Sequence, residues 1–276
     1  MLTEKRQAEH SSDTSDRPDH PPDHPPLLAL QDISFRYPGA SSQLLRGVQF
    51  FLEKQQRVGL VGPNGSGKTS LIHVIMGLLK PETGQVLLNG KEVHDKEDLR
   101  MLRRKVGLLF QDSDDQLFSP TVLEDVAFGP LNFGAGPEEA KKIAQQTLQE
   151  LKLEHLEQRI THQLSGGEKK MVSLATVLAM QPEALLLDEP TNNLDARTRS
   201  RLIEVLNGLD LALLIISHDW SLLAATCQDI CALEQGRVTM NDLSYLHDHR
   251  HAHPYGRDPH RHINNIQPQV ESAEQF

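Results

Sequence analysis

The chain has few cysteines and no long apolar run. It contains 2 cysteines in 276 residues, too few for a disulfide framework, and the spacing of Cys227 and Cys231 is not that of a usual zinc pair. We expect both to be small core residues in a reducing cytosol. No stretch approaches the ~20 apolar residues of a membrane-spanning helix, and the polar segment 1–26 lacks the apolar block of a secretory signal peptide. These absences predict a soluble protein without a transmembrane segment, although it can still dock on a membrane component.

Positive charge is also scarce. Lysine and arginine number 28 against 38 acidic residues, so the formal net charge is −10. Because nucleic-acid binding needs a basic surface, we expect no nucleic-acid partner. The length of the chain suits one large domain with a subdomain and tails.

The segment from Arg57 to Leu71 carries the clearest functional signal. A short apolar strand, 58–61, leads into a glycine-rich loop and then into an apolar helical stretch through Met76, which is the setting of a phosphate-binding loop. The glycines let successive N–H groups converge on a phosphate, and the start of the helix attracts negative charge. The nucleotide-binding residues expected here are Gly62, Pro63, Asn64, Gly65, Ser66, Gly67, Lys68, Thr69 and Ser70.

Two side chains of this loop have separate expected roles. Lys68 can reach the β- and γ-phosphates, and the Thr69 hydroxyl can ligate Mg²⁺. The alternative is a glycine-rich turn without a ligand, which the complete motif between a strand and a helix disfavours. The chain is therefore predicted to bind a nucleoside triphosphate with magnesium.

Another apolar strand, 184–187, delivers two acids to its carboxyl end. Asp188 is expected to hold Mg²⁺ through water. Glu189 can orient and deprotonate the attacking water, a role typically worth ~10²–10⁴-fold in rate. The alternative is a pair of carboxylates in a solvated turn.

Three further candidates lie at the ends of predicted strands. Gln111 follows the strand 105–110 and His218 follows the strand 211–216; ligands of open α/β sheets bind at such carboxyl ends. Taken alone, Gln111 would be a solvated loop residue, and His218 would be a core or surface histidine with satisfied hydrogen bonds. Because His218 follows a strand that ends at the same edge of the sheet as the others, contact with the γ-phosphate is favoured for it. Tyr37 is either a core aromatic at a strand end or a ring stacked on the nucleotide base.

The order of strand and helix patterns predicts an α/β protein. It consists of a P-loop NTPase core with a mostly parallel sheet, an N-terminal antiparallel β subdomain over about 27–61, and an inserted α-helical subdomain. The insertion covers roughly 113–163 and extends to about 181 with the next helix. Within it, Thr121–Phe128 is expected to be a short helix that the breakers Gly129 and Pro130 end.

Together these motifs resemble the ATP-binding-cassette ATPases. The resemblance covers roughly 27–241 and is carried, in order, by the loop, Gln111, the segment 164–168, the segment 185–189 and His218. Alone, the serine and glycines of 164–168 would be an ordinary helix start. Within this order they correspond to the family's signature.

The resemblance implies a role for each motif. Tyr37 would stack on adenine, and Gln111 would contact Mg²⁺ and sense the partner. The segment 194–195 looks like the D-loop, and His218 like the switch histidine. The signature would cover the γ-phosphate held by a second subunit, so that ATP closes a dimer and hydrolysis reopens it; its residues are Ser165, Gly166, Gly167 and Glu168.

Within the family, 112–130 resembles the ATPase subunits of energy-coupling-factor importers for cobalt, nickel and vitamins. This implies a transmembrane coupling subunit, a substrate-binding membrane component, and a second ATPase subunit that is an identical chain or a paralogue. It also implies a peripheral position on the cytoplasmic face of the cell membrane. The chain departs from the usual pattern at Met171, where many relatives carry arginine, and at Asn192 and Asn193, where alanine and glycine are frequent.

Histidine is concentrated in the tails, which hold nine of the 14: His10, His20, His24, His247, His249, His251, His253, His260 and His262. We expect a disordered His/Pro-rich tail over 1–26, an ATPase domain over 27–246 and a flexible His-rich tail over 247–276. Neutral imidazole suits Ni²⁺ and Co²⁺, and the six C-terminal histidines are the candidate ligands. A purification tag or a tail without a ligand is the alternative.

The favoured function is the ATP-hydrolysing motor of a nickel or cobalt importer. A vitamin importer is an alternative within the same family. A His-rich nickel metallochaperone GTPase would need an Asn-Lys-x-Asp motif, which the chain lacks. A cassette acting on DNA or ribosomes usually carries long coiled coils or two cassettes.

Overall fold

A six-stranded sheet forms the core of the computed structural model, which describes residues 24–241, 249–251 and 260–262. Neighbouring strands follow the order β10-β9-β3-β8-β7-β6, and all pairs except β10 with β9 are parallel. The strands are β3 (Arg57–Val61), β6 (Val106–Leu109), β7 (Ala184–Asp188), β8 (Ala212–Ile216), β9 (Asp229–Glu234) and β10 (Arg237–Asn241).

The central strands are apolar throughout because both faces of the sheet are covered. In β7, Ala184 and Leu186 belong to the core cluster on one face, while Leu185 and Leu187 belong to the cluster on the other. This alternation of side-chain direction explains why the strand carries no polar face.

A second sheet, antiparallel and in the order β2-β1-β4-β5, confirms the predicted β subdomain but not its bounds, because 57–61 joins the parallel sheet and two strands beyond residue 61 join this one. Its apolar face shares a core cluster with one face of the parallel sheet and with helix α1 (Lys68–Ile75), which contributes Leu71, Ile72 and Ile75. The strands of this sheet are β1 (Leu28–Phe35), β2 (Leu45–Leu52), β4 (Thr83–Leu88) and β5 (Lys91–Glu92).

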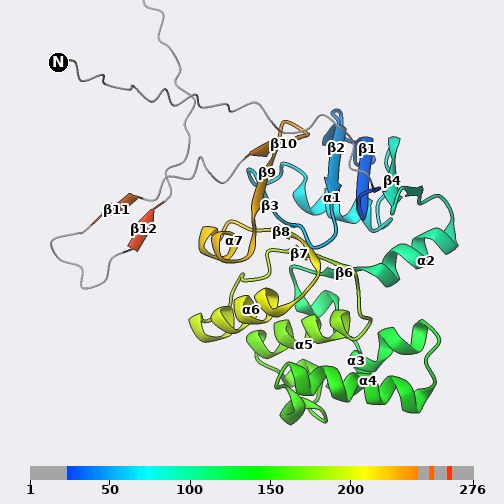
Figure 1. Ribbon diagram of the computed structural model, residues 1–276, viewed down its shortest axis with the longest axis vertical. Helices are drawn as coiled ribbons and strands as arrows, with labels where there is room; N and C mark the ends of the chain where they lie inside the picture. Colours follow the sequence, from blue (N-terminus) through cyan, green and yellow to red (C-terminus); the bar gives the residue numbers. More distant parts are fainter. Residues whose placement is uncertain (1–23, 242–248, 252–259, 263–276) are drawn as a thin grey trace, which may run out of the picture.

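Helix α2 packs on the same core cluster as α1, through Leu102. Helices α3 to α7 contribute to the cluster on the other face, and the helical insert lies at the bottom of Figure 1. The insert is built from α3, α4 and α5, which pack on one another. The helices are α2 (Lys96–Lys105), α3 (Val122–Asn132), α4 (Pro137–Glu150), α5 (Gly166–Leu178), α6 (Ala196–Gly208) and α7 (Trp220–Thr226), with short 3₁₀ turns at Ser113–Asp115, Glu154–Leu156 and Thr161–Gln163.

Helix α3 is longer than the sequence predicted. It continues through Gly129 and Pro130 to Asn132, so the expected stop at Phe128 is wrong. Gly129 serves packing instead, since a Cβ there would lie 2.7 Å from Cγ of Met180, just beyond α5. Pro130 lies in the last turn of the helix and lacks the backbone N–H for one bond of that turn.

Cys227 and Cys231 are free and buried, as predicted. In the described part of the chain, no helix combines the length and apolarity needed to cross a membrane. The predicted N-terminal tail lies outside the described residues up to 23. In the C-terminal tail, β11 (His249–His251) pairs antiparallel with β12 (His260–His262), and the other tail positions are not described.

Candidate active site

The glycine-rich loop between β3 and α1 adopts a backbone that requires glycine. Gly62 has φ 150°, and a Cβ there would lie 2.4 Å from the carbonyl oxygen of Leu233. Gly67, at φ 105°, immediately precedes α1. That helix has no side-chain cap and no acid in its first turn, so its first N–H groups are free to receive an anion.

Lys68 is folded back over this loop. Its Nζ donates to the carbonyl oxygens of Gly62 at 2.8 Å and Pro63 at 3.0 Å, and the residue is 7 % exposed. Burial lowers the pKa of the lysine, although the charges of Glu189 and Asp188 favour its protonated form. The loop therefore holds a cation whose present partners are neutral carbonyls, which an anionic phosphate can replace.

A cavity of about 560 Å³ brings eleven of the predicted site residues together, while Gly62, Pro63 and Ser66 of the loop are not on its wall. It is lined from the phosphate-binding loop, from the β subdomain and from the ends of β6, β7 and β8. The predicted residues on its wall are Tyr37, Asn64, Gly65, Gly67, Lys68, Thr69, Ser70, Gln111, Asp188, Glu189 and His218.

Asp188 fits a magnesium ligand. It is 4 % exposed, and its Oδ1 finds no hydrogen-bond partner among the described residues. Such an orphaned buried carboxylate oxygen costs free energy unless something binds it. Thr69 and Gln111 line the same cavity, so an oxygen-rich set of the kind Mg²⁺ prefers is present.

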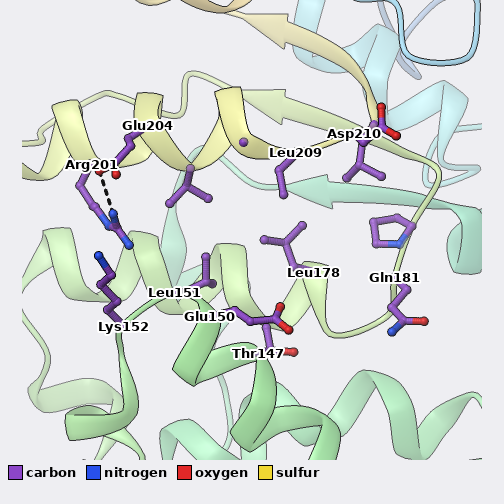
Figure 2. Close-up of a pocket in the computed structure, with 14 residues that line it drawn as sticks. Thr147, Glu150, Leu151, Lys152, Leu178, Gln181, Arg201, Glu204, Leu209 and Asp210 are labelled. Carbon is purple, nitrogen blue, oxygen red and sulfur yellow. Dashed lines mark hydrogen bonds and ion pairs between the residues drawn. The ribbon is translucent and has the colours of Figure 1, made fainter.

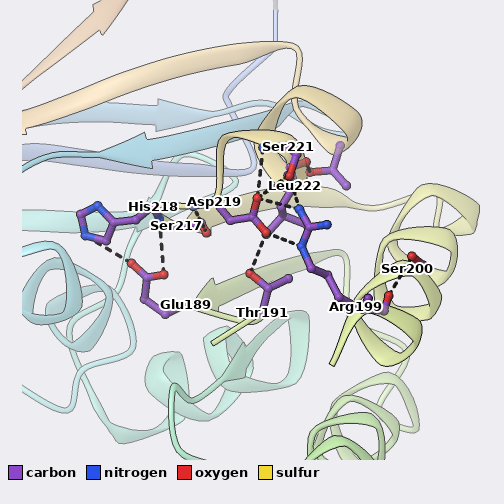
Figure 3. A network of polar contacts seen from close by, with 11 residues as sticks. Glu189, Thr191, Arg199, Ser200, Ser217, His218, Asp219, Ser221 and Leu222 are labelled. Carbon is purple, nitrogen blue, oxygen red and sulfur yellow. Dashed lines mark hydrogen bonds and ion pairs between the residues drawn. The ribbon is translucent and has the colours of Figure 1, made fainter. Parts of the chain in front are cut away.

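Glu189 and His218 face each other across this cavity (Figure 3). The imidazole Nε2 lies 3.5 Å from Oε1 of the glutamate, and the backbone N–H of His218 donates to Oε2 at 3.4 Å. Burial raises the pKa of Glu189, and its contacts with His218 oppose that rise. A carboxylate with a raised pKa is a better proton acceptor than an exposed one.

Tyr37 stands at the rim of the cavity. Its hydroxyl forms a hydrogen bond with Oγ of Ser70 at 2.9 Å, and its ring makes an edge contact with Phe35 at 4.9 Å between centroids. The residue is 44 % exposed. This ring is thus held in place by neighbours while it remains accessible to a ligand.

Most of the signature segment lies apart from the phosphate-binding loop within one chain. Ser165 caps α5 through a reciprocal pair of bonds: its Oγ accepts from the Glu168 N–H at 3.3 Å, and Glu168 Oε2 accepts from the Ser165 N–H at 2.8 Å. None of Ser165, Gly166, Gly167 and Glu168 lines the cavity that holds the loop. Gly166 alone of these four lines a neighbouring cavity, of about 510 Å³, together with Thr69, Gln111 and Asp188.

Two charged groups near the site were missed by sequence reasoning. Lys170 is buried, and its Nζ donates to the carbonyl oxygens of Phe110 at 3.0 Å and Gln111 at 2.7 Å. Arg199 forms a two-pronged ion pair with Asp219. The separations in sequence between these partners give no sign of the contacts. The sequence indicates only that Asp219, which stands directly before a helix, can cap that helix.

The departures from the family pattern have local explanations. Met171 is 4 % exposed and packs in the core of the helical side. Asn193 has φ 60°, the left-handed conformation that asparagine tolerates better than most other non-glycine residues. Asparagine therefore suits the backbone at this position.

A larger cavity, of about 590 Å³, lies between α4, α5 and α6 (Figure 2). Its wall contains the Arg201–Glu204 ion pair, at 2.7 Å, but none of the predicted site residues. Size therefore does not locate the active site here; the convergence of the phosphate-binding loop with Asp188 and Glu189 does.

The fold and this site define a P-loop NTPase. The model of the ABC transporter family matches residues 45–192. A Nitratidesulfovibrio vulgaris protein, provisionally described as an ABC transporter ATP-binding protein, is 55% identical over 237 residues, covering 86% of each chain. The cobalt import ATP-binding protein CbiO of Rhodobacter capsulatus is 41% identical over 217 residues, covering 77% of each chain.

Solved structures agree. CbiO1 from Clostridium perfringens, part of the transporter complex CbiONQ, matches with a TM-score of 0.70 and 32% identity over 79% of this chain and 88% of its own. A dimeric cassette in a post-hydrolysis state with ADP and phosphate matches with a TM-score of 0.70 and 28% identity, over 78% and 98%. The chain belongs to the ABC transporter family: it is an ATP-binding subunit, an ATPase coupled to transport.

Proposed function

We propose that this chain is one of two ATPase subunits that drive a membrane importer for nickel or cobalt ions. The observation that carries the mechanism is the cavity that joins the phosphate-binding loop to Asp188, Glu189 and His218. The metal cargo is supported by the cobalt import protein among the relatives and by the histidines of the tail. A vitamin importer is the alternative cargo class.

The loop would bind the phosphates of ATP, and three residues would hold Mg²⁺. Lys68 exchanges its carbonyl partners for the β- and γ-phosphates, and the N–H groups at the start of α1 complete the cradle. Thr69, Gln111 and Asp188 are the magnesium ligands, directly or through water. When bound, the ion neutralises charge that develops on the phosphates.

Glu189 and His218 would carry out hydrolysis. Glu189 accepts a proton from the attacking water, for which its raised pKa is suited. His218 contacts the γ-phosphate, and its ring lies beside the Glu189 carboxylate. Tyr37 stacks on the base at the open rim, where its ring is exposed.

Each complete site would need a second ATPase subunit, either a copy of this chain or a paralogue. Ser165, Gly166, Gly167 and Glu168 would belong to the site of the second subunit. There the N–H groups of Gly166 and Gly167, which the Ser165 cap does not use, can receive an anion. A related cassette is a dimer with ADP and phosphate. Binding of ATP then closes the pair, and hydrolysis reopens it.

The membrane subunits would dock beside α3, on the cytoplasmic face of the membrane. Phe118 and Phe128 are 64 % and 43 % exposed, and their rings meet edge to face at 4.6 Å between centroids. Leu131 is also exposed and lines a shallow cavity of about 410 Å³ with Phe128. Exposed aromatic side chains gathered in this way are typical of protein contacts.

The paired strands of the tail would bind the transported class of metal ion. His249 stands opposite His262, and His251 opposite His260. The backbone register therefore pairs four of the candidate histidines with one another. His247 and His253, the other candidate ligands, lie outside the described residues.

Uptake by the assembled complex in lipid vesicles tests this function. We expect ⁶³Ni²⁺ or ⁵⁷Co²⁺ to accumulate with ATP, and accumulation to stop with Lys68→Ala. Deletion of 248–276 should lower the number of Ni²⁺ ions bound without stopping ATPase activity. Uptake of a vitamin instead of either metal would overturn the cargo, and unchanged Ni²⁺ stoichiometry would reject the tail site.

A further inference from the structure

Asp219 is the centre of a polar network beside the catalytic groups (Figure 3). Its Oδ2 accepts hydrogen bonds from Nε of Arg199 at 2.6 Å and from Oγ1 of Thr191 at 3.2 Å, and its Oδ1 accepts from Nη2 of Arg199 at 2.7 Å. The same carboxylate caps α7 through the N–H groups of Ser221 and Leu222, each at 3.1 Å. One side chain therefore joins three separate segments.

Each of these segments adjoins a residue of the proposed site. Asp219 directly follows His218, and Thr191 stands two residues after Glu189. Arg199 lies in the first turn of α6, and its backbone N–H donates to the carbonyl oxygen of Asp195, the residue that caps this helix. The ion pair thus connects the 194–195 turn to the loop of the histidine.

The ion pair between Arg199 and Asp219 is held in place more firmly than an ordinary surface ion pair. The two side chains are 30 % and 23 % exposed, and the arginine uses the planar, two-pronged geometry that a lysine cannot reproduce. Burial alone would raise the pKa of Asp219, but hydrogen bonds from Arg199 and Ser221 outweigh it and hold the pKa well below its usual range. The carboxylate therefore stays charged at neutral pH.

His218 depends on this support because its own contacts with Glu189 are long, at 3.4 and 3.5 Å. The N–H of Asp219 also donates to Oγ of Ser217 at 3.0 Å, which fixes the backbone on both sides of the histidine. The signature touches the same helix turn, since a Cβ on Gly167 would lie 2.8 Å from Oγ1 of Thr198.

We propose that Arg199 is a positioning residue for ATP hydrolysis: through Asp219 it holds His218 against Glu189. A displacement of the 194–195 turn is passed by the same ion pair to the histidine. This inference rests on the proposed function, in which Glu189 and His218 act on the γ-phosphate and the attacking water.

Arg199→Met tests the proposal, with Arg199→Lys and Arg201→Met beside it. Arg199→Met removes both the positive charge and the planar guanidinium, whereas Arg199→Lys keeps the charge alone. Arg201 is a matched control on the same helix, paired with the largely exposed Glu204. For each variant we would measure the ATP dissociation constant, kcat and the unfolding temperature.

We expect Arg199→Met to lower kcat by about ten- to a hundredfold, the scale of a catalytic group misplaced by a fraction of an ångström to 1 Å. The ATP dissociation constant should stay within about twofold, because no contact to the nucleotide is removed. Arg199→Lys should lie between this variant and the wild type, and Arg201→Met should match the wild type. In a double-mutant cycle, Asp219→Asn should add little to Arg199→Met.

A lower unfolding temperature with unchanged kcat per folded enzyme would overturn the proposal, because the pair would then be structural only. If Arg199→Met fails to fold, the kcat of Arg199→Lys decides, and a value equal to that of the wild type overturns the inference. Failure of the proposed function would give a different result: Glu189→Gln would then hydrolyse ATP normally.

Discussion

Replacing Lys170 with methionine removes a buried cation that ties α5 to the segment after β6. Its Nζ donates to Phe110 O at 3.0 Å and Gln111 O at 2.7 Å, and the residue is 3 % exposed. Burial lowers the pKa of this lysine, while Asp112 and Asp188 favour its charged form. Methionine has a similar shape and no donor, so the change isolates the two polar contacts.

The expected loss follows from those contacts. A hydrogen bond from a charged donor contributes about 1.5–3 kcal/mol, and burying the methionine side chain offsets about 1–2 kcal/mol of the two lost bonds. The free energy of unfolding should therefore fall by about 3 kcal/mol. For a chain of this size, that corresponds to a fall in the unfolding temperature of roughly 6–12 °C.

Thermal unfolding followed by circular dichroism measures this difference. Lys169→Met is the matched control, because its ion pair with Asp114 at 2.5 Å involves a largely exposed carboxylate and should contribute at most ~1 kcal/mol. If Lys170→Met melted at the same temperature as Lys169→Met, the two carbonyl contacts would not stabilise the protein. The reasoning from burial and charge at this position would then be refuted.

Three other predictions concern the site itself. Lys68→Ala should weaken ATP binding at least tenfold by fluorescence titration, and unaltered affinity would contradict its contact with the phosphates. Gly62→Ala should lower both stability and ATP binding, since its Cβ would meet the Leu233 carbonyl; a variant that unfolds and binds like the wild type would show that the loop gives way. In a pH titration of kcat, the acid limb should lie above the ordinary glutamate pKa, because activity needs the ionised form of Glu189 and burial raises its pKa; a limb at or below the ordinary value would exclude Glu189 as the base.

Sequence alone predicted the parts of the site that follow from strand order. The apolar run 184–187 had to be a strand buried on both faces, and the acids that follow it had to reach the edge where the loop begins. The loop itself was predictable because its glycines are required by the backbone, as at Gly62.

Contacts between distant segments were not predictable. The ion pair between Arg199 and Asp219 joins residues 20 positions apart, and the bonds from Lys170 span 59 and 60 positions. Their geometry depends on how α5 and α6 pack on the sheet. Gly129 gave a false signal for the same reason: its close approach to Met180, not a break in the helix, explains the glycine.

Closure of two subunits around ATP is the central claim, and a cross-link across the interface tests it most directly. One subunit carries Asn64→Cys, and the second subunit carries Gly166→Cys or, if it is a paralogue, a cysteine at the corresponding position. Both changes are made in the Glu189→Gln background. Both positions are exposed, a Cβ at Gly166 meets nothing within 4 Å, and the native cysteines are buried. We expect a short thiol reagent to join the chains only with ATP and Mg²⁺. Saturated ATP binding without any cross-link between the chains would contradict the account.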